Sequence, residues 1–197
     1  MTRTITLAVL APVLLLGGCL SFGGEAPDSL LTLTPTATAP AGAGAVAAQG
    51  TALAMVEFEA TRALDVTRVP VQVTDTQLAY LQDAVWVDRP ARLFGQLVAE
   101  TIRSRTGRVV IDGADPGVNA TDRLHGSLRA FGYDARTREA VVTFDAVRNT
   151  NDAEPMTRRF EARVPVTAPE TAFVGPALNQ AANDVAGQIA DWVGQDA

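Results

Sequence analysis

Two amphipathic helical segments, set among runs of alternating apolar residues, constrain the fold of this 197-residue chain more than any other feature. Residues 90–107 carry apolar side chains at the spacing of one helix face, with Pro90 suited to the first turn and Gly107 to the C-terminal cap. A second stripe recurs at steps of three and four over residues 176–193, and Gly175-Pro176 is expected to open that helix. The two stripes consist of Leu93, Phe94, Leu97, Val98 and Ile102, and of Leu178, Ala182, Val185, Ile189 and Trp192.

The rest of the chain alternates with the period of a half-buried strand. Pro70 favours an edge position for the strand at 69–73, and Gln82-Asp83 is expected to join 78–81 and 84–87 as a tight hairpin. Residues 134–139 join two longer strands as a second hairpin. The predicted strands are 29–34, 54–60, 69–73, 78–81, 84–87, 108–112, 123–133, 140–148 and 159–166. The fold class predicted is α+β, a mixed, mainly antiparallel sheet packed by two main amphipathic helices.

Residue types that are scarce in this chain exclude several functions. All sixteen basic residues are arginine, so a P-loop ATPase, a Schiff-base enzyme and a lysine general base are excluded. One cysteine and one histidine leave no basis for a zinc site, a disulfide framework or a His-centred triad. A net charge of −6 and a pI of about 4.7 argue against nucleic-acid binding. We therefore expect a protein that is not an enzyme and has no metal or cofactor.

Two clusters of residues are possible exceptions to this expectation. His125 and Ser127 share a strand face and could serve a hydrolase, but no G-x-S-x-G elbow accompanies them, so a sheet-face histidine is favoured. Asp112, Asp115 and Asp122 lie in or near a Gly/Pro-containing loop, but their spacing does not match a calcium-binding loop. Turn chemistry explains these acids as well.

Two further acidic residues are expected to form ion pairs across the sheet. Glu57 and Glu59 share one strand face, and Arg129 or Arg163 is the expected partner across the sheet. Such exposed pairs contribute well under about 1 kcal/mol each, so they would support the sheet and not mark a site.

The N-terminus carries the pattern of a secretory signal that ends at the single cysteine. Arg3 supplies a positive n-region, and residues 5–16 form an apolar run too short to span the ~30 Å hydrocarbon layer of a membrane. Leu16-Gly17-Gly18-Cys19 resembles the lipobox of bacterial lipoproteins. The resemblance implies lipid transfer to the Cys19 thiol, cleavage between Gly18 and Cys19, and a protein attached to the membrane by acyl chains such as palmitate. Leu rather than Asp at position 20 favours the outer over the inner membrane.

Composition divides the chain into three parts. Residues 1–18 are the predicted signal peptide, residues 19–28 a lipid-anchored tether and residues 29–197 a single domain. Residues 35–50, rich in Ala, Pro, Gly and Thr, are expected to form a flexible loop or linker. The tether beyond Cys19 reaches only about 30 Å when fully stretched, which places the domain near the membrane.

Four segments of the predicted domain, together with the lipobox, carry a resemblance to a known family. They are Arg68-Val69-Pro70-Val71, Ala79-Tyr80-Leu81, the block from Trp86 to Phe94, and the closing helix from Ala177-Leu178-Asn179 to Trp192. A lipobox, a strand, and a Tyr-Leu…Trp segment running into an amphipathic helix are similar to the ABC-type transport auxiliary lipoproteins, the PqiC-like family. The resemblance covers about residues 29–193.

The resemblance implies a non-enzymatic accessory lipoprotein of an MCE-type ABC lipid transport system on the periplasmic side of the envelope. The implied partners are a periplasmic MCE-domain protein, an ABC permease and an ATPase, with phospholipid and a homo-oligomer left open. Candidate docking residues are Arg68, Tyr80, Trp86 and Arg89, although Tyr80 and Trp86 could equally pack the first helix on the sheet. The alternative is another envelope-assembly or ligand-binding periplasmic lipoprotein.

Overall fold

The computed structural model describes residues 29–42, 44, 52–112, 120–150 and 153–195. Eight strands and two helices follow one another along the chain in the order β1–β4, α1, β5–β8, α2. Their bounds are β1 Leu53–Met55, β2 Glu59–Ala60, β3 Arg68–Gln72, β4 Leu78–Val85, α1 Pro90–Thr106, β5 Val110–Asp112, β6 Asp122–Asp134, β7 Glu139–Thr150, β8 Met156–Pro165 and α2 Thr171–Gly194. The predicted α+β class is confirmed.

The long strand β6 organises a single mixed sheet. β7 pairs antiparallel along one edge of β6 and continues to β8, which forms the predicted long hairpin. Along the other edge of β6, β1, β2 and β3 pair in succession and in parallel. β5 adds to β1 in parallel, and β4 adds to β3 antiparallel. Long antiparallel ladders are thus joined by short parallel ones.

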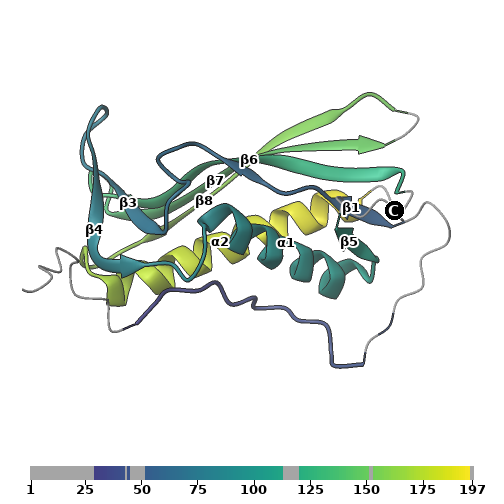
Figure 1. Ribbon diagram of the computed structural model, residues 1–197, viewed down its shortest axis with the longest axis horizontal. Helices are drawn as coiled ribbons and strands as arrows, with labels where there is room; N and C mark the ends of the chain where they lie inside the picture. The colour runs from purple at the N-terminus through teal and green to yellow at the C-terminus, as the bar shows by residue number, and fades with distance from the viewer. Residues whose placement is uncertain (1–28, 43, 45–51, 113–119, 151–152, 196–197) are drawn as a thin grey trace, which may run out of the picture.

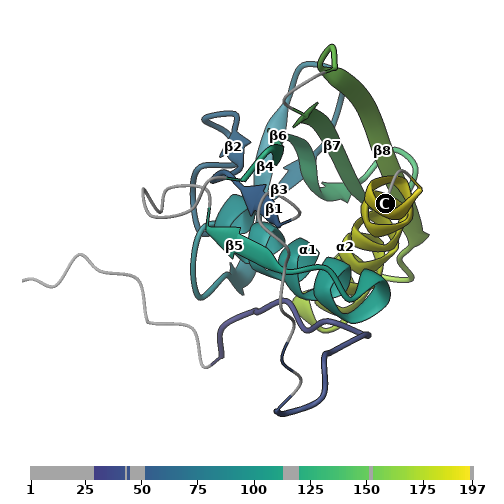
Figure 2. The same cartoon turned by 90° about the vertical axis from the view of Figure 1, so that its right-hand side faces the viewer.

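Both helices cover the same face of this sheet (Figures 1 and 2). α1 ends as predicted, with Gly107 in the left-handed conformation (φ 69°) and its N–H bonded to the carbonyl of Arg103. The predicted apolar stripe of α2 is buried along its whole length, so this helix packs internally against α1, β7 and β8. Within the described residues, neither helix is long and apolar enough to cross a membrane.

The core between sheet and helices is centred on aromatic rings. Phe94 of α1 lies with its ring centroid 5.3 Å from that of Phe144 and 6.4 Å from that of Phe131. Phe58 contacts Phe144 at 4.4 Å, and Trp86 contacts Phe131 at 5.3 Å. The edge-on and tilted geometries are those that aromatic pairs prefer.

Residues 29–42 run along the outside of the two helices, away from the sheet (Figures 1 and 2). The backbone N–H of Thr34 donates to Asn179, that of Thr36 to Asn183 and that of Ala39 to Glu100, each at 2.8 Å. The first part of the predicted 35–50 loop is therefore fastened to α2 and α1. The remainder of that loop, the tether and the lipobox with Gly18 and Cys19 lie largely outside the described residues.

Three strand predictions were wrong in the first part of the sheet. The predicted strand 54–60 is interrupted, since only Leu53–Met55 (β1) and Glu59–Ala60 (β2) pair in the sheet. Residues 29–34 form no strand, and only Leu31 makes an isolated parallel bridge, to Trp86. Residues 78–81 and 84–87 do not form a hairpin, because β4 runs through to Val85 as one strand. Asp83 adopts a left-handed φ of 54° inside β4, which shifts the strand without reversing it.

Two proline-based predictions were also wrong. β3 is not an edge strand, since it lies between β4 and β6. Pro70 is tolerated there because the β3–β6 ladder begins only at Val71 and the β3–β4 register shifts between Arg68 and Pro70. α2 begins at Thr171 rather than at Pro176. Pro176 is exposed near the helix start, where the absent N–H forfeits only one hydrogen bond.

Candidate docking surface

Arg68 and Tyr80, two of the predicted docking residues, form a stacked pair on β3 and β4. The guanidinium carbon of Arg68 lies 3.8 Å from the centroid of the Tyr80 ring, which is cation–π geometry. Tyr80 is the register partner of Pro70, which is two residues from Arg68 on β3. The antiparallel ladder therefore brings the side chains of Arg68 and Tyr80 together. Arg68 is exposed and Tyr80 half-buried, and both are residue types that dominate protein–protein contacts.

Arg89, a third predicted docking residue, stands at the N-cap position of α1, makes no side-chain capping hydrogen bond and is exposed. Its guanidinium lies 3.2 Å from the carboxylate of Asp65, with both side chains more than half exposed. The segment from Asp65 to Arg68 joins this ion pair to the stacked pair, so the two occur within a few residues of one another. We call Asp65, Arg68, Tyr80 and Arg89 the docking surface.

Trp86, the fourth predicted docking residue, lies in the core and not on the surface. Its side chain is 1% exposed and packs edge-on against Phe131. The indole nitrogen has no hydrogen-bond partner among the residues that the structure describes, so the contribution of Trp86 is apolar packing. The packing alternative weighed for Trp86 is the one that the structure shows.

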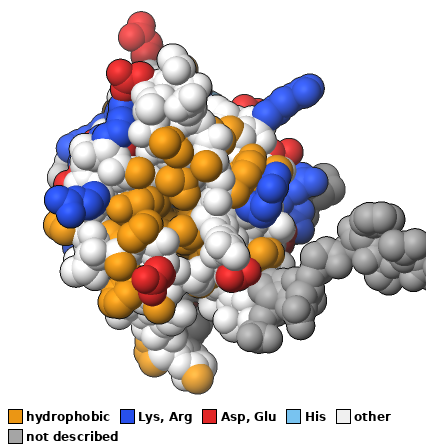
Figure 3. Space-filling model, turned by 90° about the vertical axis from the view of Figure 1, so that its left-hand side faces the viewer, with side chains coloured by type: hydrophobic (Ala, Val, Ile, Leu, Met, Phe, Trp, Pro, Cys, Tyr) orange, Lys and Arg blue, Asp and Glu red, His pale blue; other side chains and the backbone are white. Residues whose placement is uncertain are grey.

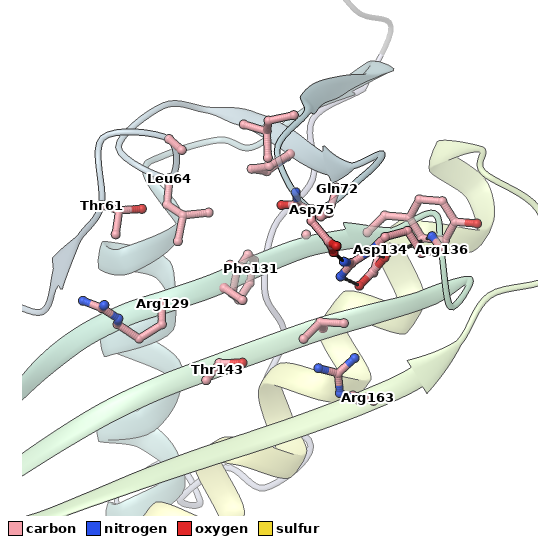
Figure 4. A pocket seen from close by; sticks show the side chains of 17 residues that line it. Thr61, Leu64, Gln72, Asp75, Arg129, Phe131, Asp134, Arg136, Thr143 and Arg163 are labelled. Carbon is pink, nitrogen blue, oxygen red and sulfur yellow. Dashed lines mark hydrogen bonds and ion pairs between the residues drawn. The ribbon is translucent and has the colours of Figure 1, made fainter.

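A groove of about 350 Å³ lies on the opposite face of the sheet from the helices. It is bounded by the 61–64 turn and β3 on one side and by β6, β7 and β8 on the other (Figure 4). Leu64, Pro70, Leu78 and Val141 supply apolar lining. Arg68 lies on β3 and Tyr80 on β4, and these two strands also contribute Pro70 and Leu78 to the lining of the groove.

The arginines that line the groove are each paired with carboxylates. Arg136 contacts both Asp134 and Asp75 (Figure 4). Arg163 pairs with Glu161 at 2.7 Å and Glu139 at 3.4 Å, while Arg129 lies 3.5 Å from Asp145. This charge balance differs from a phosphate-binding cradle, in which positive charge exceeds negative charge.

These ion pairs lower the pKa values of the carboxyl groups concerned. The side-chain hydrogen bond from Arg136 lowers the pKa of Asp134, and that from Arg163 lowers the pKa of Glu161. The hydrogen bond from Arg159 likewise lowers the pKa of Asp145. The carboxylates therefore stay ionised to a lower pH than ordinary carboxyl groups, and the outer face of the sheet presents charges of both signs.

Asp122, one of the three acids weighed as a calcium site, is instead part of a buried ion-pair cluster. Arg148 donates from Nε and Nη2 to the two oxygens of Asp122 at 3.0 and 2.9 Å, and Arg108 donates to one of them at 2.8 Å. Burial alone would raise the pKa of Asp122, but the hydrogen bonds from Arg148 and Arg108 lower it. Asp115 and the side chain of Asp112 lie outside the described residues. No group of metal-ligating side chains occurs within the described part of the chain.

The two other sets of candidate residues, His125 with Ser127 and Glu57 with Glu59, lie on or beside the sheet. His125 and Ser127 share a face of β6 and are partly exposed, and no hydrogen bond joins them. Glu57 does not pair across the sheet as expected. It lies 3.6 Å from Arg92 of α1, since residues 56–58 leave the sheet between β1 and β2.

Sequence reasoning missed Asp65 and the groove, including the roles of Arg129 and Arg163 in it. The alternation of Arg159, Glu161 and Arg163 along β8 was a signal for a charged sheet face, but their partners on β7 depend on register. The groove itself depends on how the 61–64 turn lies over β6, which no local pattern encodes.

The geometry defines an α+β domain with a candidate docking surface that is largely exposed and a charge-balanced outer sheet face. The family model for the ABC-type transport auxiliary lipoprotein component matches residues 31–190, and the chain belongs to this family. The resemblance found in the sequence is therefore confirmed. No curated protein matches the chain.

Solved structures with the same fold include two with low sequence identity to this chain. Protein XCC0632 from Xanthomonas campestris, assigned to the family DUF330, is similar with a TM-score of 0.69 and 20% identity, over 84% of this chain and 94% of that one. An uncharacterized protein is similar with a TM-score of 0.64 and 15% identity, over 76% of this chain and 96% of that one. At these identities the likeness concerns the fold.

Proposed function

We propose that this chain is the non-enzymatic accessory lipoprotein of an MCE-type ABC lipid transport system. Membership of the transport auxiliary family supports an association with an ABC transporter. The absence of lysine from the sequence means that this chain has no Walker A lysine for ATP hydrolysis, so a separate ATPase would supply the energy. The chain would require no cofactor beyond the covalent lipid.

The proposed attachment to the envelope is through Cys19. Cleavage between Gly18 and Cys19 and acylation of Cys19 would hold the protein on the periplasmic side of a membrane, with the outer membrane favoured by Leu20. The mature protein would carry no other cysteine. Two or more acyl chains give stable attachment, whereas one alone gives only marginal binding.

The Arg68–Tyr80 pair is the observation that carries the proposed docking to the MCE component. An exposed guanidinium stacked on an aromatic ring is already ordered, so a partner that covers it would lose little side-chain entropy. The adjoining Asp65–Arg89 ion pair would add charged contacts at the rim of the same interface.

The test is crosslinked affinity purification of the full-length lipoprotein from membranes, with the recovered proteins identified by mass spectrometry. We expect an MCE-domain protein, its permease and its ATPase. Arg68→Ala and Tyr80→Ala should each reduce that recovery severalfold, whereas Tyr80→Phe should retain it because the ring remains.

Arg123→Ala is the matched control, since Arg123 is also an exposed arginine of the sheet but lies on β6 away from the docking surface. Recovery of the acylated protein alone, or with unrelated envelope-assembly factors, would contradict the transport proposal. Equal recovery with Arg68→Ala and Arg123→Ala would contradict the docking surface alone.

The groove supports a second candidate function, that of a ligand-binding periplasmic lipoprotein. Its apolar lining and rim of charges of both signs would suit an amphiphile with a zwitterionic headgroup, such as a phospholipid. Native mass spectrometry of the purified protein tests this. A bound phospholipid that is lost in Leu64→Asp would support it, and a bare protein would contradict it.

A further inference from the structure

One end of the long axis of the molecule exposes a continuous hydrophobic patch (Figure 3). The elements that meet there are the end of β4, the start of α2 and the first described residues of the chain (Figure 1). Leu30 is 52% exposed, Val87 50% and Phe173 46%, which is high for large apolar side chains. We call Leu30, Val87 and Phe173 the end patch.

Backbone contacts hold the end patch together. The N–H of Leu31 donates to the carbonyl of Val85 at 2.7 Å, and the N–H of Val87 donates to the carbonyl of Leu31 at 2.9 Å. The hydroxyl of Thr171 donates to the carbonyl of Gln82 at 3.1 Å and so fastens the start of α2 to β4. The exposed apolar side chains are therefore presented by fixed backbone.

The end patch coincides with the point where the chain enters the domain. Leu30 belongs to the end patch, and only residues 20–28 separate the described chain from Cys19. A tether of this length reaches about 30 Å at most. If Cys19 is in the bilayer, the end of the domain at which the tether enters is the end closest to the lipid.

We propose that the end patch rests on the bilayer to which Cys19 is attached, with Leu30, Val87 and Phe173 in the interfacial region. This proposal rests on the acylation of Cys19 proposed above. The opposite end of the long axis, where β7 turns into β8, then points away from the membrane (Figure 1).

The composition of the end patch indicates that it would bind a lipid surface by apolar contact and not by electrostatic attraction to the headgroups. Within four residues of Val87 and Phe173 lie three acids, Asp83, Asp88 and Glu170, and one arginine, Arg89. The whole chain has a net charge of −6, so anionic headgroups would not attract this end of the domain. Apolar contact remains as the source of binding. A protein partner on this face would have to fit between the domain and the bilayer, within the short reach of the tether.

A depth measurement on the acylated full-length protein tests the proposal. Once Cys19 is acylated, a cysteine introduced by Val87→Cys or Phe173→Cys is the only free thiol and can carry a bimane fluorophore. Ala153→Cys, exposed in the turn between β7 and β8, is the control. The proteins are reconstituted in phosphatidylcholine vesicles that contain doxyl-labelled lipid, which quenches bimane on contact.

We expect severalfold stronger quenching at positions 87 and 173 than at 153, with the probes about 5–10 Å below the headgroup boundary. The quenching should persist in about 1 M salt, where the Debye length is about 3 Å. Phe173→Asp should reduce the quenching at position 87, and circular dichroism checks that this variant remains folded.

Vesicle-bound protein with equal or absent quenching at all three positions would overturn the proposal. Energy transfer between two copies labelled at position 87, without lipid quenching, would also overturn it and would assign the end patch to a second copy. Protein that is not acylated and does not sediment with vesicles would contradict the Cys19 attachment itself. The two failures are therefore distinguishable.

Discussion

Arg148 and Asp122 form a bidentate ion pair beneath the β6–β7 ladder, with side chains only 3% and 8% exposed. Removal of one partner from such a pair leaves a buried charge without its counter-ion. Asp122→Asn should therefore lower the free energy of unfolding by about 3–5 kcal/mol. Urea denaturation followed by circular dichroism measures this loss.

Asp75→Asn is the control for that substitution. Asp75 also pairs with an arginine, Arg136, but its side chain is 88% exposed. Exposed ion pairs contribute about 0–1 kcal/mol, so this variant should remain close to the parent protein. Equal losses for the two variants would contradict the structural role of the buried cluster.

The pH dependence of stability follows from the lowered carboxyl pKa values. Asp122, Asp134, Asp145 and Glu161 have folded-state pKa values below those of an unfolded chain, which lie near 4. The unfolded state therefore binds more protons as the solution is acidified. Stability contributed by these groups is present above about pH 5 and is lost as the pH falls through the folded-state values.

Thermal melts between about pH 6 and pH 2 check this dependence. The melting temperature should fall with acidification, and the fall should be shallower in Asp122→Asn, which lacks one of the four groups. A melting temperature that rises on acidification would contradict the ion pairing.

Gly132 lies against the backbone of β3, and the same substitution at another glycine is expected to have the opposite effect. A β-carbon on Gly132 would overlap the carbonyl oxygen of Pro70, which cannot move without disturbing β3. Gly132→Ala should thus destabilise the protein by about 1–3 kcal/mol or more. Gly95 is within α1 and has only an ordinary 3.6 Å approach to Phe58, so Gly95→Ala should stabilise by up to about 1 kcal/mol. Chemical denaturation of both variants measures the sign of each effect.

Asn183 fastens the N-terminal segment to α2. Its amide donates to the carbonyls of Thr34 and Asn179 at 3.0 and 2.8 Å and accepts from Thr36. Asn183→Ala leaves the Thr34 carbonyl and the Thr36 N–H without this partner, at a cost of about 1–3 kcal/mol, whereas the Asn179 carbonyl keeps its bond within α2. Hydrogen exchange should show faster exchange at Thr36 in this variant. Gln180→Ala, at an exposed position on α2, should leave that exchange unchanged.

Processing at the lipobox is tested by Cys19→Ser. The hydroxyl cannot accept the thioether-linked lipid, so we expect an unprocessed precursor that is not labelled by radioactive palmitate. Acylation of the Cys19→Ser protein would refute the assignment of Cys19 as the modified residue. Gly132→Ala serves as a reference for a destabilised protein that should still be acylated.

The spacing of apolar residues correctly predicted those parts of the fold that depend on residues close together in the sequence. The α1 stripe with Gly107 after it, the β6–β7 hairpin and the buried seam of α2 all depend on residues close in sequence. The sequence pattern could not predict which strands pair in parallel. β1, β2 and β3 reach β6 only through long-range contacts, and the position of Pro70 inside the sheet depends on where those ladders begin.

The sequence could not show which of the candidate docking residues are exposed. Arg68, Tyr80 and Arg89 lie at or near the surface, whereas Trp86 lies in the core. An alternating pattern cannot separate these cases, because Asp83 with its positive φ shifts which face of β4 the following residues occupy. Glu57 was assigned to the sheet for a similar reason, since the chain leaves the ladder between β1 and β2.

The bridge between Leu31 and Trp86 determines how a mechanical load would enter the domain. A pull on the lipid-bearing end would act first on the two hydrogen bonds that join Leu31 to Val85 and Val87. Leu31 runs parallel to that stretch, so a pull along it would load both bonds in shear rather than one after the other. Asn179 and Asn183 would take up the force only after that bridge has broken. The domain would therefore resist traction from the bilayer at its junction with the tether before any helix or strand is disturbed.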